Sequence, residues 1–185
     1  MTDDDRGRRL LDTGFSGDTG APDPALAAAL ASYAADPVTG DAGVLEALAG
    51  AIGGAGTGAA GSGARLLVPV VAVLGEAEVD GAGLAHDKSS DMAAVLLTGA
   101  DGRLALLAFT GTEAMRRWNP EARPVPVAAG LAAQAAVQEG AAALVVDVAG
   151  PVRFVVEAED LQGLASGWTP ARVGGRAAWI RPAPE

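Results

Sequence analysis

A helical period opens the patterned part of the chain. Asp23 and Pro24 are typical of an N-cap and a first helical position, and apolar side chains then recur every three or four residues as far as Asp36. A second short helix is expected after a cap near Asp41, with one apolar face made of Val44, Leu45, Leu48 and Ile52. The pattern therefore predicts two successive helices.

From residue 65 the pattern changes to continuous apolar runs of strand length. The run LLVPVVAVL predicts a strand, and Pro69 is expected to confine it to a sheet edge or a bulge, because proline cannot donate to a ladder. The runs MAAVLLT and RLALLAFT are separated by GADG, whose Asp101-Gly102 pair is typical of a hairpin turn. Further strands are expected at 122–128, where the strand is short and at an edge, at 142–148, where it is buried, and at 153–158.

Helices are predicted between these strands. Thr110 and Glu113 form a capping box for a short helix that Asn119-Pro120 ends, and a second helix at 129–140 is closed by Gly140. Residues 159–165 suggest one more helix. Helices mixed with hairpin-joined strands favour an α+β fold, a single domain with a mixed, largely antiparallel sheet flanked by short helices.

Segments without periodicity bound this region. Residues 1–22 are expected to form a disordered tail, and residues 53–64 a flexible glycine-rich linker inside a domain that spans 23–167. Residues 168–185 are expected to form a C-terminal tail, although RAAWIRP within it could add an edge strand.

Composition narrows the possible partners and compartment. The formal net charge is −10, which disfavours nucleic acid and anionic membranes because their phosphates require basic partners. The chain has no cysteine, which excludes disulfides, thiolate nucleophiles and iron–sulfur ligation. An acidic amino terminus and the shortness of the longest apolar run predict a cytoplasmic protein. Heavy use of Ala, Gly and Arg resembles the bias of a bacterial genome rich in G+C.

Residues 85–94, AHDKSSDMAA, concentrate the unusual side chains. They hold the only histidine and the only lysine of the chain, surrounded by acids and serines: His86, Asp87, Lys88, Ser89, Ser90 and Asp91. Such a segment could be a recognition loop, because exposed polar loops on a rigid scaffold often carry binding residues. It could equally be a solvated connection in which Ser and Asp side chains satisfy backbone amides.

Catalytic and metal interpretations of this loop are weak. His86, Asp87 and Asp91 could surround a divalent metal, but three ligands from six consecutive residues make a poor cage. The two serines lack a base from another element, and nucleophile–base pairs work by convergence of separate elements. The stretch 53–63 matches G-x-G-x-x-G, but it follows a predicted helix and precedes a predicted strand, the reverse of a dinucleotide site. No catalytic residue, metal, cofactor or enzymatic activity is therefore expected.

Two isolated residues also stand out. Trp118 follows two arginines at the end of the predicted short helix, where its ring could cap the edge of the core or act as a partly exposed contact anchor. Asp147 lies in an otherwise apolar strand, where an ionised group is costly unless it is paired. Arg103 or Arg153 could pair with it, or its carboxylate could reach solvent.

Several of these stretches together resemble the amino-terminal domain of the SseB family, named for enhanced serine sensitivity. They are LLVPVVAVLGE, HDKSSDMAAVLLTGADGR, LLAFTGTEAMRRWNPEARPVPV and GAAALVVDVAGPVRFVV. The resemblance covers roughly residues 26–166, and its most specific part runs from Phe109-Thr110 to Trp118, a turn, helix and Trp that members place after a hairpin. Many members carry Asn-Pro near the strand end where this chain has Asp147-Val148. The resemblance implies a small bacterial cytoplasmic protein and no established reaction.

Two functions remain open on this basis. The first is a non-enzymatic interaction or regulatory module of the SseB type, whose sheet edge and 85–91 loop contact a protein partner or a small metabolite. The alternative is binding of an amino acid or related metabolite, or service as an enzyme accessory protein, with Asp87, Lys88, Ser89 and Asp91 as polar anchors. An enzyme would require remote polar groups that converge on these residues in a concave pocket.

Overall fold

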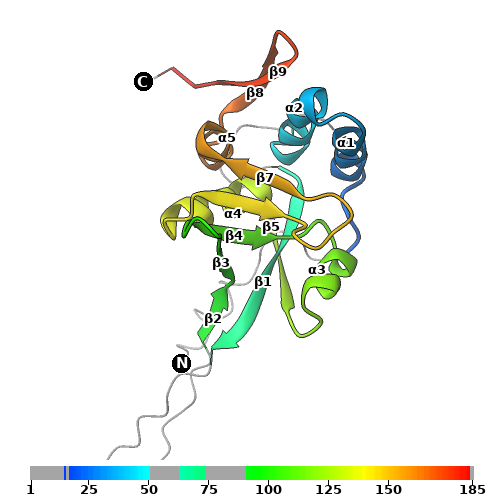
Figure 1. The fold of residues 1–185 in the computed structure, drawn as a ribbon, viewed down its shortest axis with the longest axis vertical. Coiled ribbons are helices and arrows are strands. Elements are labelled where there is room, and N and C mark those ends of the chain that lie inside the picture. The colour runs from blue at the N-terminus through cyan, green and yellow to red at the C-terminus, as the bar shows by residue number, and fades with distance from the viewer. Residues whose placement is uncertain (1–14, 16, 51–62, 74–90, 184–185) are drawn as a thin grey trace, which may run out of the picture.

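Figure 1 shows the protein as a computed structural model that describes residues 15, 17–50, 63–73 and 91–183. The helices within these residues are α1 (Pro24–Ala35), α2 (Pro37–Leu48), α3 (Thr112–Trp118), α4 (Ala129–Gln138) and α5 (Ala158–Ala165). The strands are β1 (Arg65–Val73), β2 (Asp91–Ala94), β3 (Leu96–Thr98), β4 (Leu104–Ala108), β5 (Arg123–Ala128), β6 (Ala143–Val146), β7 (Phe154–Glu157), β8 (Thr169–Val173) and β9 (Arg176–Ile180). None of the described helices is both long enough and apolar enough to cross a membrane.

The described strands form three sheets. Their orders are β2-β1-β5, β3-β4-β6-β7 and β8-β9. Strands β4 and β6 pair in parallel, and the other pairings between these strands are antiparallel. The predicted α+β class, with a mixed and largely antiparallel arrangement and short flanking helices, is confirmed. The predicted hairpin around Asp101-Gly102 is confirmed as well, since β3 and β4 pair on either side of it.

The core occupies both faces of the four-stranded sheet, because successive side chains of a strand point in opposite directions. Leu106 and Ala108 of β4 belong to the larger cluster, which α1, α2, α4 and α5 complete on one face. Helices α1 and α2 lie side by side (Figure 1). Leu107 and Phe109 point to the other face and join a smaller cluster with Leu67 of β1 and Met115 of α3.

Pro69 lies in a central strand and not at an edge, because β1 is flanked by both β2 and β5. Its carbonyl accepts from the N–H of Val95 at 3.2 Å, and the carbonyl of Val95 accepts from the N–H of Leu107 at 3.3 Å. Val95 is the residue where the chain passes from β2 to β3. An N–H at position 69 would need the carbonyl of Val95 as its acceptor, but that carbonyl already accepts from Leu107 of β4. A proline, which has no N–H, is therefore tolerated at position 69.

Two predicted helix starts differ from the structure. Helix α1 is capped by Asp23 as expected, but α2 begins earlier than predicted, because Asp36 accepts from the N–H of Val38 at 3.0 Å. The predicted capping box is wrong: the N-cap of α3 is Gly111, without a side-chain hydrogen bond, and Thr110 bonds elsewhere. The start of α3 is instead set by its tertiary surroundings.

The predicted C-terminal tail is wrong for residues 169–180, which form the β8–β9 hairpin, although the strand considered within RAAWIRP is present as β9. Gly174 and Gly175 both have positive φ, as a tight two-residue hairpin turn requires. Trp179 packs against Gly163 of α5 so closely that a Cβ at Gly163 would clash with the ring, and its indole N–H donates to Asp160 at 2.8 Å. Arg172 donates twice to Glu46 of α2, at 2.6 and 2.7 Å, which lowers the pKa of Glu46. The hairpin is therefore docked on two helices.

The predicted disordered tail, residues 1–22, differs from the structure at residues 17–22. Residues 17–22, the N-terminal strap, lie against the domain through hydrogen bonds to the carbonyls of Gly20 and Ala21 and an ion pair of Asp18. Residues 1–14 and 16 lie outside the described part of the chain, and so does most of the predicted linker, residues 53–62.

We expect Trp179→Phe to lower the free energy of unfolding by about 1 kcal/mol, because the ring packing on Gly163 persists while the hydrogen bond to Asp160 is lost. Trp179→Ala should cost more, because it also removes the buried ring surface. Urea unfolding measures both changes. The neighbouring Ile180, which is 59% exposed, supplies the control: Ile180→Ala should change stability by less than about 0.5 kcal/mol. Equal stability of all three variants and the wild type would contradict the docking of the hairpin.

Candidate functional site

The predicted recognition loop can be placed only at its end. His86, Asp87, Lys88, Ser89 and Ser90 lie outside the described residues, whereas Asp91 begins β2 opposite Val73 of β1. The predicted contact anchor, Trp118, is the last residue of α3 and is half-buried. Its ring lies 5.5 Å from that of Phe109 with a tilt of 33°, so it covers one border of the smaller cluster.

A buried carboxylate lies at the carboxyl end of the parallel strand pair. Because β4 and β6 run in the same direction, the residues that follow them meet, and the N–H of Asp147 donates to Ala108 at 2.9 Å. Thr110 then donates twice to Asp147, from its N–H to Oδ1 at 2.9 Å and from its hydroxyl to Oδ2 at 2.7 Å. Asp147 is 3% exposed and Thr110 is 5% exposed. The pairing thus brings together two residues distant in sequence.

The predicted partners of Asp147 were wrong. Arg103 is engaged on the surface with Asp101 at 2.6 Å and with Glu157 at 3.5 Å, and the Asp147 carboxylate does not reach solvent. Burial raises the pKa of Asp147, and the two bonds from Thr110 and the charge of Arg117 oppose this rise. Asp147 also has a φ of 52°, a left-handed conformation that Asp and Asn adopt more readily than most residues.

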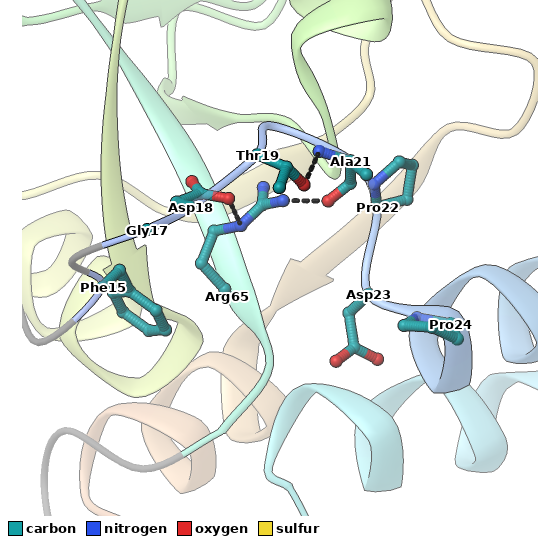
Figure 2. A pocket seen from close by; sticks show the side chains of 9 residues that line it. All are labelled: Phe15, Gly17, Asp18, Thr19, Ala21, Pro22, Asp23, Pro24 and Arg65. Atoms are coloured by element: carbon teal, nitrogen blue, oxygen red, sulfur yellow. Dashed lines mark hydrogen bonds and ion pairs between the residues drawn. The ribbon is translucent and has the colours of Figure 1, made fainter.

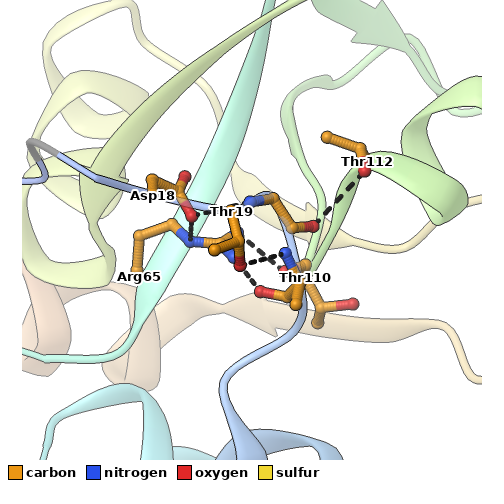
Figure 3. A network of polar contacts seen from close by, with 7 residues as sticks. Asp18, Thr19, Arg65, Thr110 and Thr112 are labelled. Carbon is orange, nitrogen blue, oxygen red and sulfur yellow. Dashed lines mark hydrogen bonds and ion pairs between the residues drawn. The ribbon is translucent and has the colours of Figure 1, made fainter.

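A buried arginine extends this network to the N-terminal strap (Figure 3). Arg65 begins β1, is 9% exposed and donates to the carbonyl of Thr110 at 2.8 Å. Its guanidinium also donates to the carbonyl of Ala21, and its Nε lies 3.2 Å from Oδ1 of Asp18. Thr110 therefore connects two charged side chains: it donates to the carboxylate of Asp147 and accepts from the guanidinium of Arg65. The two charges are joined through Thr110 and not by direct contact.

The strap borders a cavity beside Arg65 (Figure 2). The cavity has a volume of about 540 Å³, and its lining consists of Phe15, Gly17, Asp18, Thr19, Ala21, Pro22, Asp23, Pro24 and Arg65. Most of the wall is the strap and the start of α1, and Arg65 supplies the one basic group among the lining residues. Such a volume is typical of a site for a small molecule or part of a peptide.

A second surface is the outer sheet face, the side of the four-stranded sheet that carries the smaller cluster. Leu97 of β3 pairs with Ala105 of β4, and Val155 of β7 pairs with the cluster residue Val145, so each pair shares this face. Leu97 is 41% exposed and Val155 is 43% exposed. The side chains that remain partly or largely exposed on this face are Val95, Leu97, Ala105, Trp118, Val148 and Val155.

Sequence reasoning overlooked Arg65 and Asp18. A possible signal for Arg65 was its place as the single charge at the start of an apolar strand, where a basic side chain requires acceptors if it is buried. For Asp18, the signal was the local sequence Asp18-Thr19-Gly20, which is typical of a side-chain-stabilised turn and is observed as a 3.0 Å bond from the N–H of Gly20. Neither signal shows that the two residues meet.

All buried side-chain nitrogen and oxygen atoms in the described residues have hydrogen-bond partners. Within the same residues, His, Asp and Glu side chains form no group of three or more that could hold a metal ion. The buried polar side chains Arg65, Thr110 and Asp147 are thus engaged with one another or with the backbone.

Comparison with protein families identifies a match over residues 26–163, to the family described as the SseB protein N-terminal domain. This matched region is more than half of the chain, and it confirms the resemblance read from the sequence. It contains Arg65, Thr110 and Asp147, begins after the strap and ends before the β8–β9 hairpin. Searches of curated proteins and of solved structures each return no match.

We expect Asp147→Asn to leave stability unchanged or raised at pH 7, and Asp147→Ala to lower the free energy of unfolding by about 1–3 kcal/mol. Asparagine can accept the Thr110 N–H, donate to the Thr110 hydroxyl and adopt the left-handed backbone, whereas alanine leaves both buried donors unpaired. Urea unfolding checks it, and a larger loss for Asn than for Ala would contradict it.

A comparison of the wild type with Asp147→Asn tests the raised pKa of Asp147. Between the ordinary pKa of 3.8 and the raised value, the folded state holds more protons than the unfolded state. The stability of the wild type relative to Asp147→Asn should therefore be greatest below this window and should fall as pH rises through it. Unfolding curves at several pH values measure this difference. A difference that grows with rising pH would show that the carboxyl has a lowered pKa instead.

Proposed function

The chain belongs to the SseB N-terminal domain family, and on that premise we propose that it is a non-enzymatic interaction module that binds a protein partner through its outer sheet face. The observation that carries this proposal is the cluster of apolar side chains that remain exposed there. Leu97 and Val155 are each more than two-fifths exposed, at the β3 and β7 edges of one sheet face, and Trp118 packs against the buried cluster between those edges. Exposed apolar side chains on both sides of a partly covered cluster can together form a protein contact surface.

The charges at the border of this face suggest the chemistry of the partner. Arg103, Arg117 and Arg153 are exposed at the ends of β4, α3 and β7, and two of them have acidic neighbours on the surface, Arg103 with Glu157 and Arg117 with Glu113. A partner with apolar side chains flanked by charges of both signs would complement this arrangement, because such rim charges direct and orient association. The aromatic anchor Trp118 is of the type that commonly dominates binding energy.

The buried polar groups support a structural role and not a catalytic one. Both oxygens of Asp147 accept from Thr110, and three nitrogens of Arg65 are directed at acceptors of the chain. A catalytic acid or base needs a proton-transfer partner in a substrate, so groups that are already saturated within the fold are poor candidates.

The 85–91 loop remains part of the proposal as a second contact region. It precedes β2, an edge strand of the β2-β1-β5 sheet, and its charged residues could add charge-assisted contacts to the same partner or to a small metabolite. Asp91 begins β2, which lies in a different sheet from the outer sheet face, so variants of each can be compared independently.

We expect Val155→Asp to weaken partner binding at least about tenfold, because it places a charge in the apolar contact surface. Val38→Asp is the matched control, since Val38 is 78% exposed on α2, a helix that packs on the opposite side of the sheet. Proteins retained from a lysate of the source organism would be identified with the wild type, and the retained protein purified for calorimetric titration against each variant.

Melting curves should show that both variants remain folded. Loss of binding in Val155→Asp with retention in Val38→Asp supports the outer sheet face, and equal affinity of the two variants for the purified partner would refute it. The double variant Lys88→Ala/Asp91→Ala, measured with the same partner, tests the loop.

A further inference from the structure

We propose that the surroundings of Arg65 form a binding site for an acidic peptide, and that the N-terminal strap occupies this site within the same chain. The proposal does not rest on the outer sheet face. It rests on how the strap is held, how little of it is buried and where the family match begins.

The strap contributes acceptors and the domain contributes donors. Gly20 accepts from the Thr112 N–H at 2.9 Å, Ala21 accepts from the Arg65 guanidinium, and the Asp18 carboxylate lies 3.2 Å from Arg65 Nε. Two main-chain carbonyls and one carboxylate are groups that any peptide with a suitably spaced acid can supply. The contact is therefore of a kind that a second chain could reproduce.

The site also selects for glycine. A Cβ at Gly20 would lie 2.5 Å from Cγ2 of Thr112, and Gly20 has a φ of 74°. Across the contact, a Cβ at Gly111 would lie 2.9 Å from the carbonyl oxygen of Gly20. The two backbones thus approach where neither has a side chain, and we expect the preferred peptide to carry an acid two residues before a glycine.

Arg65 is the group that such a ligand would pair with. It is 9% exposed, and without the strap its guanidinium would retain only the Thr110 carbonyl among its three acceptors. When the strap leaves, water replaces Asp18 and Ala21 at the guanidinium, which can then form charge-assisted bonds with an incoming acid. In contrast, Gly20 is the only buried residue of the strap. Because little apolar surface holds the strap, its release costs little hydrophobic free energy.

The residues that match the family include the site around Arg65 but not the strap. Arg65, Gly111 and Thr112 lie within the matched residues 26–163, whereas the whole strap precedes them. The strap leads through Pro22 to α1, and the cavity of about 540 Å³ between the strap and Arg65 leaves space beside the guanidinium. The site thus lies within the matched region, and the strap that fills it lies outside that region.

The test uses the full chain and a labelled peptide of residues 15–24, FSGDTGAPDP, measured by fluorescence anisotropy. In the wild type the strap competes at an effective concentration on the order of millimolar, so the peptide should bind weakly. Gly20→Val should unseat the strap by its clash with Thr112, and Asp18→Asn should weaken it. Both variants should bind the peptide at least about tenfold more tightly than the wild type does.

Two controls separate recognition from general disturbance. Gly174→Val also places valine at a positive φ, in the β8–β9 turn where nothing lies within 4 Å, and it should bind the peptide as the wild type does. The peptide FSGNTGAPDP, in which asparagine replaces the residue corresponding to Asp18, should bind the Gly20→Val chain at least about tenfold more weakly than the acidic peptide does, a ratio worth about 1.4 kcal/mol. This second control changes only the peptide and leaves the fold intact.

The results decide the proposal directly. Tighter binding to both strap variants, together with the preference for the acidic peptide, supports a peptide site at Arg65. Equal affinity of the wild type and both strap variants, or equal affinity of the two peptides, would overturn it and leave the strap as a fixed part of the fold.

Discussion

The parallel pairing of β4 with β6 is the interaction on which the rest of the polar structure depends. It places the residues that follow the two strands at one edge of the sheet, so that Thr110 can donate twice to Asp147. The carbonyl of Thr110 is thereby oriented toward Arg65, and Arg65 in turn holds Asp18 and Ala21 of the strap. A single strand pairing thus organises a chain of contacts from the sheet to the N-terminal segment.

This network of buried polar groups determines how the strands are arranged more than it adds to the free energy of unfolding. Burying the Asp147 carboxylate opposes ionisation, as its raised pKa shows, and the two bonds from Thr110 only partly offset that cost. Removing one partner would be expensive because the remaining buried groups would lack acceptors or donors. The network therefore favours one arrangement of β1, β4 and β6 over alternatives, which is the role that satisfied buried polar groups often have.

The two faces of the four-stranded sheet are covered unequally. Four helices complete the larger cluster on one face, whereas β1 and the short α3 cover only part of the other. Leu97 and Val155 are left exposed at the β3 and β7 edges of the smaller cluster, and Trp118 closes one border. The proposed contact surface is thus a consequence of one small, partly covered second core.

Local pattern determined much of this protein, and tertiary contacts determined the rest. The Asp23 cap, the hairpin at Asp101-Gly102, the α+β class and the family resemblance followed from the sequence, because each depends on neighbouring residues or on a run of them. The partner of Asp147, the start of α3, the central place of Pro69 and the docking of Trp179 could not be predicted. Each depends on which distant strand or helix lies alongside, as does the meeting of Arg65 with Asp18, 47 positions apart. The sequence pattern shows which residues are apolar and at what spacing. The pairing of buried polar groups depends in addition on which strands become neighbours and in which direction they run.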